Sequence, residues 1–233
     1  YAYTRGVESL SNVLFYDSRP FGGWIYQLGF NMLGFKPVIW HITSLVLRAM
    51  TAIFFWLLFR SIWDHQKKYS FYISILFLVY PFFLLQPMSV AYSIHWVGFL
   101  FYALSLWLMI MTLKNTTKFS LIFISIALMA EGLHLFTSEY FSGLEILRPF
   151  ILWVLISRQE KNVVRRIGIV FSRWLPYLLV FSIYGYWRVF IFQGPPGGDR
   201  NDPVLLFQFI SEPIGTAFQL LNTSLKDSAT ILF

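Results

Sequence analysis

The sequence predicts an all-α fold, a polytopic membrane bundle of about seven transmembrane helices with an external amphipathic helix. Three observations lead to this prediction. Hydrophobic residues make up 57% of the chain and charged residues only 12%, and the mean hydropathy of +0.62 is far above that of ordinary soluble domains. The apolar residues fall in runs of about 20, the length that crosses a bilayer. The connections between these runs alternate between basic and non-basic.

This alternation predicts the topology. The basic connections are 60–68, 114–118 and 158–166, whereas 86–94 carries no charge and 137–145 carries only acidic residues. Lys and Arg are retained in cytoplasmic loops of multi-spanning proteins. We therefore expect the acidic residues, and any chemistry, on the non-cytoplasmic side.

Seven runs are candidate spans by length and apolarity, although the fifth is short. They are 37–60, 70–88, 95–113, 119–137, 142–157, 169–192 and 204–222.

The segment 20–34 has a different pattern. Its apolar residues Phe21, Trp24, Ile25, Leu28 and Met32 recur at helical spacing. About 15 residues are too few to cross a bilayer, so we expect an amphipathic helix at the outer surface, with Trp24 and Tyr26 at headgroup level. The predicted organisation is thus an external segment 1–36, containing this helix, and a transmembrane bundle 37–233.

Several classes of function are excluded. The chain has no cysteine, which rules out disulfides, thiolate catalysis and cysteine metal sites. The net charge of +7 lies largely in short loops, so a membrane surface explains it and nucleic acid is not expected as a partner. Soluble-enzyme motifs such as G-x-S-x-G and H-E-x-x-H are absent.

Because the chain begins at Tyr1 and ends in apolar sequence, we expect it to be an interior part of a longer protein.

Arg48 is the most unusual residue of the first span, about 16 Å from its outer end. An Arg near the bilayer centre costs roughly 2.5–3.5 kcal/mol, so its side chain must face protein or water. His41, Ser44, Arg48 and Thr51 lie on one stripe of this helix. Two interpretations remain open: a structural cation that holds two helices together, or a wet cavity that binds an anion such as a lipid phosphate.

Glu131 is the expected counter-charge of Arg48 because it lies at a similar depth. His134, three residues on, shares its helical face. We predict that Glu131 lies within ion-pair or single-water distance of Arg48, and that His41, Glu131 and His134 form a structural polar network.

Glu139 and Glu145 bracket the external turn 137–145. Two carboxylates near a membrane cavity can serve as general base and metal ligand, but Glu145 and Arg148 are also spaced for a local i,i+3 ion pair. The three histidines of the outer half, His41, His95 and His134, show no metal-ligand spacing. We therefore assign no metal ligand and leave a divalent metal open as a cofactor.

Two parts of the chain resemble a known family. The first is Ser18-Arg19-Pro20-Phe21, the predicted surface helix, Leu33-Gly34-Phe35-Lys36-Pro37 and Trp40-His41-Ile42; the second runs from Glu139 to Arg148-Pro149. This pattern resembles polytopic GT-C glycosyltransferases, which include the protein O-mannosyltransferases and the transferase that adds aminoarabinose to lipid A. In these, an external R/K-P motif opens a juxtamembrane helix that ends in a Gly, before a span beginning near a His or Arg. The resemblance covers roughly the first two-thirds of the chain.

The resemblance implies transfer of a sugar from a polyprenyl-phosphate donor to an acceptor on the periplasmic face of a bacterial cytoplasmic membrane. The family's general base is an acidic residue in the first external loop. In this chain the candidate catalytic acidic residues are Asp17 and Glu139. The cations that would hold the donor phosphate are Arg19, Lys36, Arg48 and Arg188. Alternatively, Arg19 and Lys36 only anchor the chain at the membrane interface.

Two other functions remain open. The dense Phe, Trp and Tyr surface would suit a non-catalytic structural subunit, a degenerate GT-C relative within a larger membrane protein complex. A transporter using an Arg48–Glu131 polar path is the third hypothesis, against which no inverted repeat is found. Besides the donor, membrane lipids are the expected partners.

Overall fold

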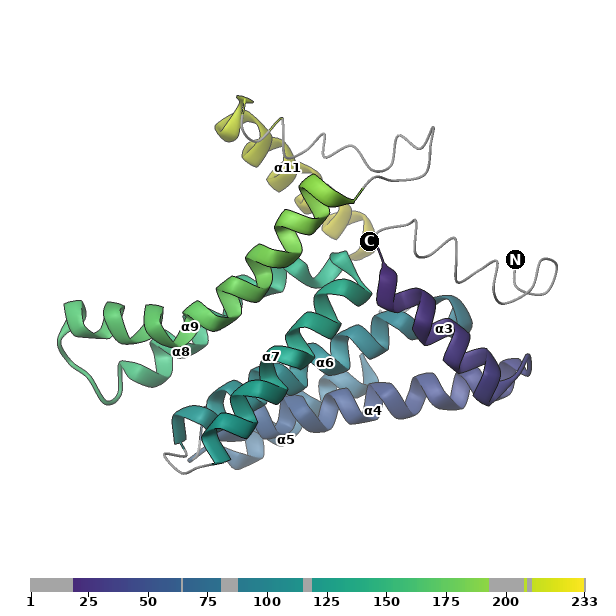
Figure 1. The fold of residues 1–233 in the computed structure, drawn as a ribbon, viewed down its shortest axis with the longest axis horizontal. Coiled ribbons are helices and arrows are strands. Elements are labelled where there is room, and N and C mark those ends of the chain that lie inside the picture. Colours follow the sequence, from purple (N-terminus) through teal and green to yellow (C-terminus); the bar gives the residue numbers. More distant parts are fainter. Residues whose placement is uncertain are drawn as a thin grey trace. The chain divides into compact units, whose positions relative to one another are not determined.

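The computed structural model describes residues 19–63, 65–80, 88–114, 119–192, 208 and 211–232, and within them every element is helical (Figure 1). The elements are α3 (Pro20–Leu33), α4 (Pro37–Ile62), α5 (Lys67–Val79), α6 (Ser89–Lys114), α7 (Phe119–Thr137), the 3-10 helix η2 (Glu139–Ile146), α8 (Leu147–Ile156), α9 (Val163–Tyr186), the π-helical turn η3 (Trp187–Ile191) and α11 (Pro213–Leu232). They fall into two compact units, within Tyr1–Phe192 and Gln193–Phe233. The predicted all-α class is therefore confirmed.

Four helices of the described residues are long and apolar enough to cross a membrane, as in an integral membrane protein. They are Pro37–Ile62, Ser89–Lys114, Ser120–Thr137 and Val163–Ile191. These correspond to the first, third, fourth and sixth predicted spans. The expected total of about seven is not confirmed.

A proline follows the helix that the structure describes within the second predicted span, 70–88. Helix α5 has 13 residues and ends at Val79, with Tyr80 as its C-cap. Pro81 follows, and a residue before proline is disfavoured in helical conformation. At 1.5 Å per residue α5 is about 20 Å long, against a hydrocarbon core of about 30 Å.

The fifth and seventh predicted spans also differ from the structure. Within the fifth predicted span, 142–157, the structure has the last part of the 3-10 helix η2, which ends at Ile146. Helix α8 follows and has only 10 residues. In place of 204–222, α11 begins at Pro213, a favoured first helical residue, and runs to Leu232. Helix α11 carries Lys226 and Asp227 and is not among the four helices apolar enough to span.

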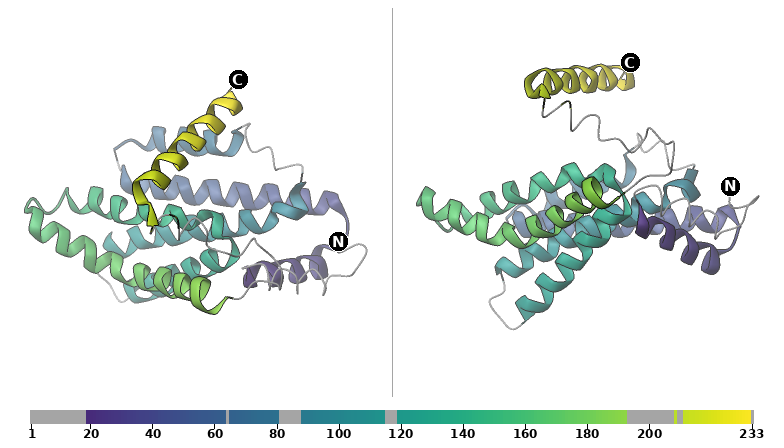
Figure 2. Two further views of the ribbon diagram at one scale, coloured as in Figure 1. Left: turned by 90° about the horizontal axis from the view of Figure 1, so that it is seen from above. Right: turned by 45° about the horizontal axis from the view of Figure 1, so that its top comes forward.

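Helix α6 is the centre of the first unit. It packs against α4 on one side and α7 on the other, and α9 lies against α7 and α8 (Figures 1 and 2). Its residues Tyr102, Leu106, Met109 and Ile110 are all buried in the main hydrophobic core. Because α6 has neighbours on opposite sides, it is apolar all round rather than amphipathic.

Helix α3 forms at the predicted place but turns a different face to the bundle. Tyr26 and Phe30 are buried, and the Phe30 ring centroid lies 4.8 Å from that of Trp40. Trp24 and Leu28 remain exposed. The expected position of Tyr26 at headgroup level stays a prediction, but its ring packs against the bundle instead of being exposed.

Tyr26 is held by the bundle. Its hydroxyl donates to the carbonyl of Ala91 in α6. Burial raises the pKa of Tyr26 to about 12, so the phenol keeps its proton and stays a donor at neutral pH. Helix α3 ends at Gly34, whose φ of 65° favours glycine.

The connections alternate between two ends of the bundle. At one end, here called the basic end, Arg158 donates to the carbonyl of Ile62, and a pocket joins Ser61, Lys114 and Arg158. At the opposite end the Arg19 guanidinium lies 4.9 Å from the Tyr140 ring centroid. The described residues of the three basic connections thus share one end, while the start of α3 and the 137–145 turn share the other.

A cysteine labelling experiment tests this arrangement, because the chain has no native cysteine to interfere. We expect Gln159→Cys at the basic end and Tyr140→Cys at the opposite end to react with a membrane-impermeant maleimide from opposite sides of vesicles. Gln159 is exposed and Tyr140 is 67% exposed, so both thiols are accessible. The unsubstituted chain is the control. Labelling of both positions from one side would contradict the arrangement.

Candidate functional site

Four ionisable side chains meet inside the bundle and are here called the buried charge cluster. Glu131 and His134 come from α7, Glu145 from η2 and Arg148 from α8. Their exposed fractions are 0%, 0%, 5% and 0%. Charged groups away from water are expensive unless they are paired, so their mutual contacts decide what the cluster does.

Arg148 and Glu145 are the strongest pair of the cluster. The Nε and Nη2 atoms of Arg148 donate to the two carboxylate oxygens of Glu145, the second over 3.2 Å. This bidentate geometry gives strong, directional hydrogen bonds. The i,i+3 ion pair predicted from the sequence is confirmed, and it bridges the junction between η2 and α8.

Arg148 also connects the other helices. Its Nη2 donates to Ser105 Oγ of α6 over 3.1 Å, and its Nε lies 3.9 Å from Glu131 Oε1 of α7. Its guanidinium carbon lies 4.7 Å from the ring centroid of Tyr177 in α9. One side chain thus contacts the three long helices that surround it.

Arg48 does not occupy the predicted position beside Glu131. The cation beside Glu131 is Arg148, whereas Arg48 Nη2 donates to the Tyr80 carbonyl over 3.2 Å and the guanidinium lies 5.6 Å from the Trp96 ring centroid. The depth of a residue along its helix does not determine which neighbouring helix its side chain contacts. Helix α6 packs between α4 and α7 and separates the two residues that the sequence placed at one level.

The partner of Arg48 explains why a cation lies in the first span. Tyr80 is the C-cap of α5, and the last carbonyls of a helix have no partner within it. A guanidinium at a helix C-terminus satisfies such a carbonyl and interacts favourably with the helix dipole. Nearby, Ser44 Oγ donates to the Ser89 carbonyl over 3.3 Å. These contacts favour the interpretation of Arg48 as a structural cation.

The predicted network of His41, Glu131 and His134 is only partly formed. Glu131 and His134 both belong to the buried charge cluster, but His41 is half-buried on α4. In the described part of the chain, no hydrogen bond or ion pair joins His41 to either of them.

The predicted phosphate-binding cations are distributed over the molecule. Arg19 and Arg188 lie at the opposite end, close in sequence to Phe21 and Trp187, whose ring centroids are 5.9 Å and 5.1 Å from that of Phe136. Lys36 is exposed beyond the far end of α3, a 14-residue helix about 20 Å long. The structure therefore does not bring Lys36 or Arg48 to Arg19.

The two predicted catalytic acids are described only in part. Asp17 lies outside the described residues. Glu139 is the first residue of η2, and the structure describes its backbone but not its side chain. Neighbouring Tyr140 stacks on His95 with ring centroids 5.4 Å apart.

Sequence reasoning missed three residues around Arg148. Tyr102 donates to the Leu144 carbonyl over 2.8 Å, and Ser105 donates to the Ala127 carbonyl over 2.7 Å. Tyr177 supplies the aromatic face under the guanidinium. The available signal was weak: a serine and two tyrosines at buried positions of otherwise apolar spans.

The arrangement can hold a proton. The Nδ1 of His134 lies 3.1 Å from the Gly98 carbonyl, which only accepts, so Nδ1 carries a hydrogen. The Nε2 of the same ring lies 3.7 Å from Glu145 Oε1. Two carboxylates face a single guanidinium, so a neutral cluster requires one more proton, on Glu131 or on His134. Among the described residues no group of three or more His, Asp or Glu side chains is arranged to hold a metal ion.

Comparison with known proteins finds no match to the chain among protein-family models, curated proteins or solved structures.

Removal of Arg148 tests the importance of the cluster. We expect Arg148→Met to lower the free energy of unfolding by about 3–5 kcal/mol, because Glu145 and Glu131 would remain buried without a cation. The matched control is Arg165→Met, which removes an exposed cation and should change stability little. The measurement is denaturation in mixed micelles. Equal effects of the two substitutions would refute the role assigned to Arg148.

The two carboxylates should respond differently to loss of charge. Glu145→Gln breaks a charge-assisted pair of hydrogen bonds and should cost about 1.5–3 kcal/mol. Within the described part of the chain the Glu131 oxygens accept no hydrogen bond, and Oε1 lies 3.9 Å from Arg148 Nε, so the cost of Glu131→Gln should be the smaller of the two. The same denaturation experiment compares them. A larger cost for Glu131→Gln would show that Glu131 is the main partner of Arg148.

Proposed function

We propose that the chain is the membrane-embedded body of a GT-C-like glycosyltransferase, which moves a sugar from a polyprenyl-phosphate donor to an acceptor at the periplasmic face of a bacterial cytoplasmic membrane. The observation that carries the proposal is the arrangement of the segment on which the resemblance rests. Arg19 precedes a helix that begins at Pro20 and is capped by Gly34, whose φ is 65°. The candidate span α4 follows directly from Pro37.

The residues of the opposite end support a phosphate-binding role. Arg19 and Arg188 are half-buried there, and a guanidinium binds phosphate oxygens through paired donors. The Arg19 guanidinium lies over the ring of Tyr140, which is 67% exposed. In the sequence Asp17 is two residues before Arg19, and Glu139 immediately precedes Tyr140. Both candidate acids are therefore sequence neighbours of residues that meet at this end.

The proposed reaction needs one base and one anion site. Asp17 or Glu139 accepts the proton of the acceptor hydroxyl, and the hydroxyl oxygen attacks the anomeric carbon of the sugar. The bond between that carbon and the phosphate oxygen breaks, and polyprenyl phosphate leaves with the electron pair. Arg19 and Arg188 stabilise the charge that develops on the leaving phosphate.

Turnover of a synthetic polyprenyl-phosphate sugar by the full chain in liposomes tests the proposal. We expect one of the variants Asp17→Asn and Glu139→Gln to lower kcat at least about 100-fold, the contribution of a general base. Arg19→Gln should lower kcat/KM, whereas Arg165→Gln at the basic end should leave it unchanged. Full activity of both acid variants would overturn the proposed base. An inactive but folded wild-type chain across mannosyl, glucosyl and aminoarabinosyl donors would overturn the transferase.

One observation favours a second candidate, a non-catalytic subunit of a membrane protein complex. The buried charge cluster is sealed by its own helices, with no member more than 5% exposed, so its charges serve the bundle rather than a substrate. In this function the exposed aromatic and aliphatic surface contacts other subunits. The same assay separates the two candidates, since a structural subunit is stable and turns over no donor.

A further inference from the structure

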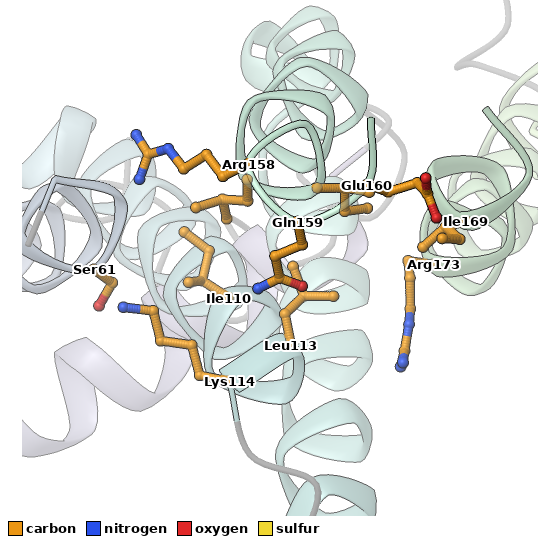
Figure 3. A pocket seen from close by; sticks show the side chains of 11 residues that line it. Ser61, Ile110, Leu113, Lys114, Arg158, Gln159, Glu160, Ile169 and Arg173 are labelled. Atoms are coloured by element: carbon orange, nitrogen blue, oxygen red, sulfur yellow. The ribbon is translucent and has the colours of Figure 1, made fainter. Parts of the chain in front are cut away.

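The basic end contains a pocket that the proposed function does not use. It has a volume of about 380 Å³ and is bounded by the ends of α4, α6 and α8 and the first turns of α9 (Figure 3). Its polar lining is Ser61, Lys114, Arg158, Gln159, Glu160 and Arg173, and the rest of the lining is aliphatic. The cations come from three separate segments, so folding assembles the site and no single stretch of sequence contains it.

The pocket lies at the depth of lipid headgroups. The pocket is bounded by Ser61 and Lys114, at the ends of the candidate spans Pro37–Ile62 and Ser89–Lys114, so it lies where these spans reach the membrane surface. In α9 no charge occurs between Arg173 and Arg188, a stretch of about 21 Å, which is shorter than a hydrocarbon core of about 30 Å. The backbone of Arg173 therefore lies inside the hydrocarbon edge, and its long side chain can place the guanidinium at the level of the lipid phosphates.

The pocket is positively charged, and some of its charged side chains already form hydrogen bonds within the protein. Arg158 is anchored by the Ile62 carbonyl, and Glu160 accepts from the backbone N–H of Asn162. Three cations against one carboxylate leave a net charge of +2. Arg173 is exposed, and within the described residues it takes part in no ion pair. A guanidinium at the edge of the hydrocarbon is stabilised by an anion.

The surroundings of the pocket also suit a lipid. Ile169, in the lining of the pocket, is 39% exposed. An acyl chain can lie along such a surface while the headgroup occupies the pocket. A free inorganic anion would gain nothing from these side chains.

We propose that this pocket binds the phosphate of an anionic membrane lipid, with Arg173 and Lys114 as the headgroup-binding residues and the aliphatic lining beside the glycerol backbone. Basic pockets between spanning helices on the positively charged side of a membrane protein bind such headgroups. The site is at the other end of the bundle from the proposed transferase residues and does not depend on them.

The test uses the purified full chain in a neutral detergent, titrated with short-chain phosphatidylglycerol while the thermal unfolding midpoint is recorded. Native mass spectrometry counts the bound lipid. Arg173→Gln should weaken the apparent affinity about fivefold, which corresponds to the loss of one interfacial cation. Lys114→Gln should act in the same direction. Arg165→Gln is the matched control, since Arg165 is an exposed cation of the basic end outside this pocket, and it should bind as the wild type does.

Separate titrations with short-chain phosphatidylcholine and with inorganic phosphate identify the ligand. We expect both to bind more weakly than phosphatidylglycerol. Equal binding of phosphatidylcholine, an equal loss of affinity in Arg165→Gln, or a full effect of inorganic phosphate would each overturn the proposal. The midpoint without lipid shows whether a variant is folded. If Arg173→Gln is not folded, Arg173→Lys should keep most of the affinity and Lys114→Gln should lose it, and the reverse order would refute the assignment.

Discussion

The pairing of Arg148 is the interaction on which the rest of the bundle depends. This side chain has no exposed surface, yet it contacts Glu145 in η2, Glu131 in α7, Ser105 in α6 and Tyr177 in α9. A buried guanidinium is tolerated only when its partners are in place. The helices that supply these partners are therefore fixed relative to one another by a single charge, and apolar packing fills the space that remains.

The second buried arginine solves a different problem. Helix α5 ends at Val79, partway along α4, and an apolar environment offers no water to its last carbonyl groups. Arg48 donates to the carbonyl of Tyr80, and Ser44 donates to that of Ser89 at the start of α6. The polar stripe of α4 thus supplies a hydrogen-bond donor for a short helix that ends at the side of the bundle.

Because the internal charges are engaged in structure, the chemistry of ligands is left to the two ends. At the opposite end Arg19 meets the 137–145 turn through Tyr140, and the acids proposed for sugar transfer are sequence neighbours of these two residues. At the basic end Lys114 and Arg173 line a pocket at headgroup depth. The two proposals therefore place sugar transfer and lipid binding at opposite ends of one bundle.

The sequence alone determined what depends on local rules: the helical class, the four long spans, the helix that begins at Pro20, the alternation of the connections and the Glu145–Arg148 pair. Each follows from spacing or composition within a few turns of chain. The total of about seven spans is not confirmed, because α5 ends before Pro81 and α11 begins at Pro213, within apolar runs that were counted as continuous. Only the tertiary structure decided that Glu131 faces Arg148 rather than Arg48. The position of a residue along its span gives its depth in the membrane, but the helix that its side chain contacts is set by how the helices pack.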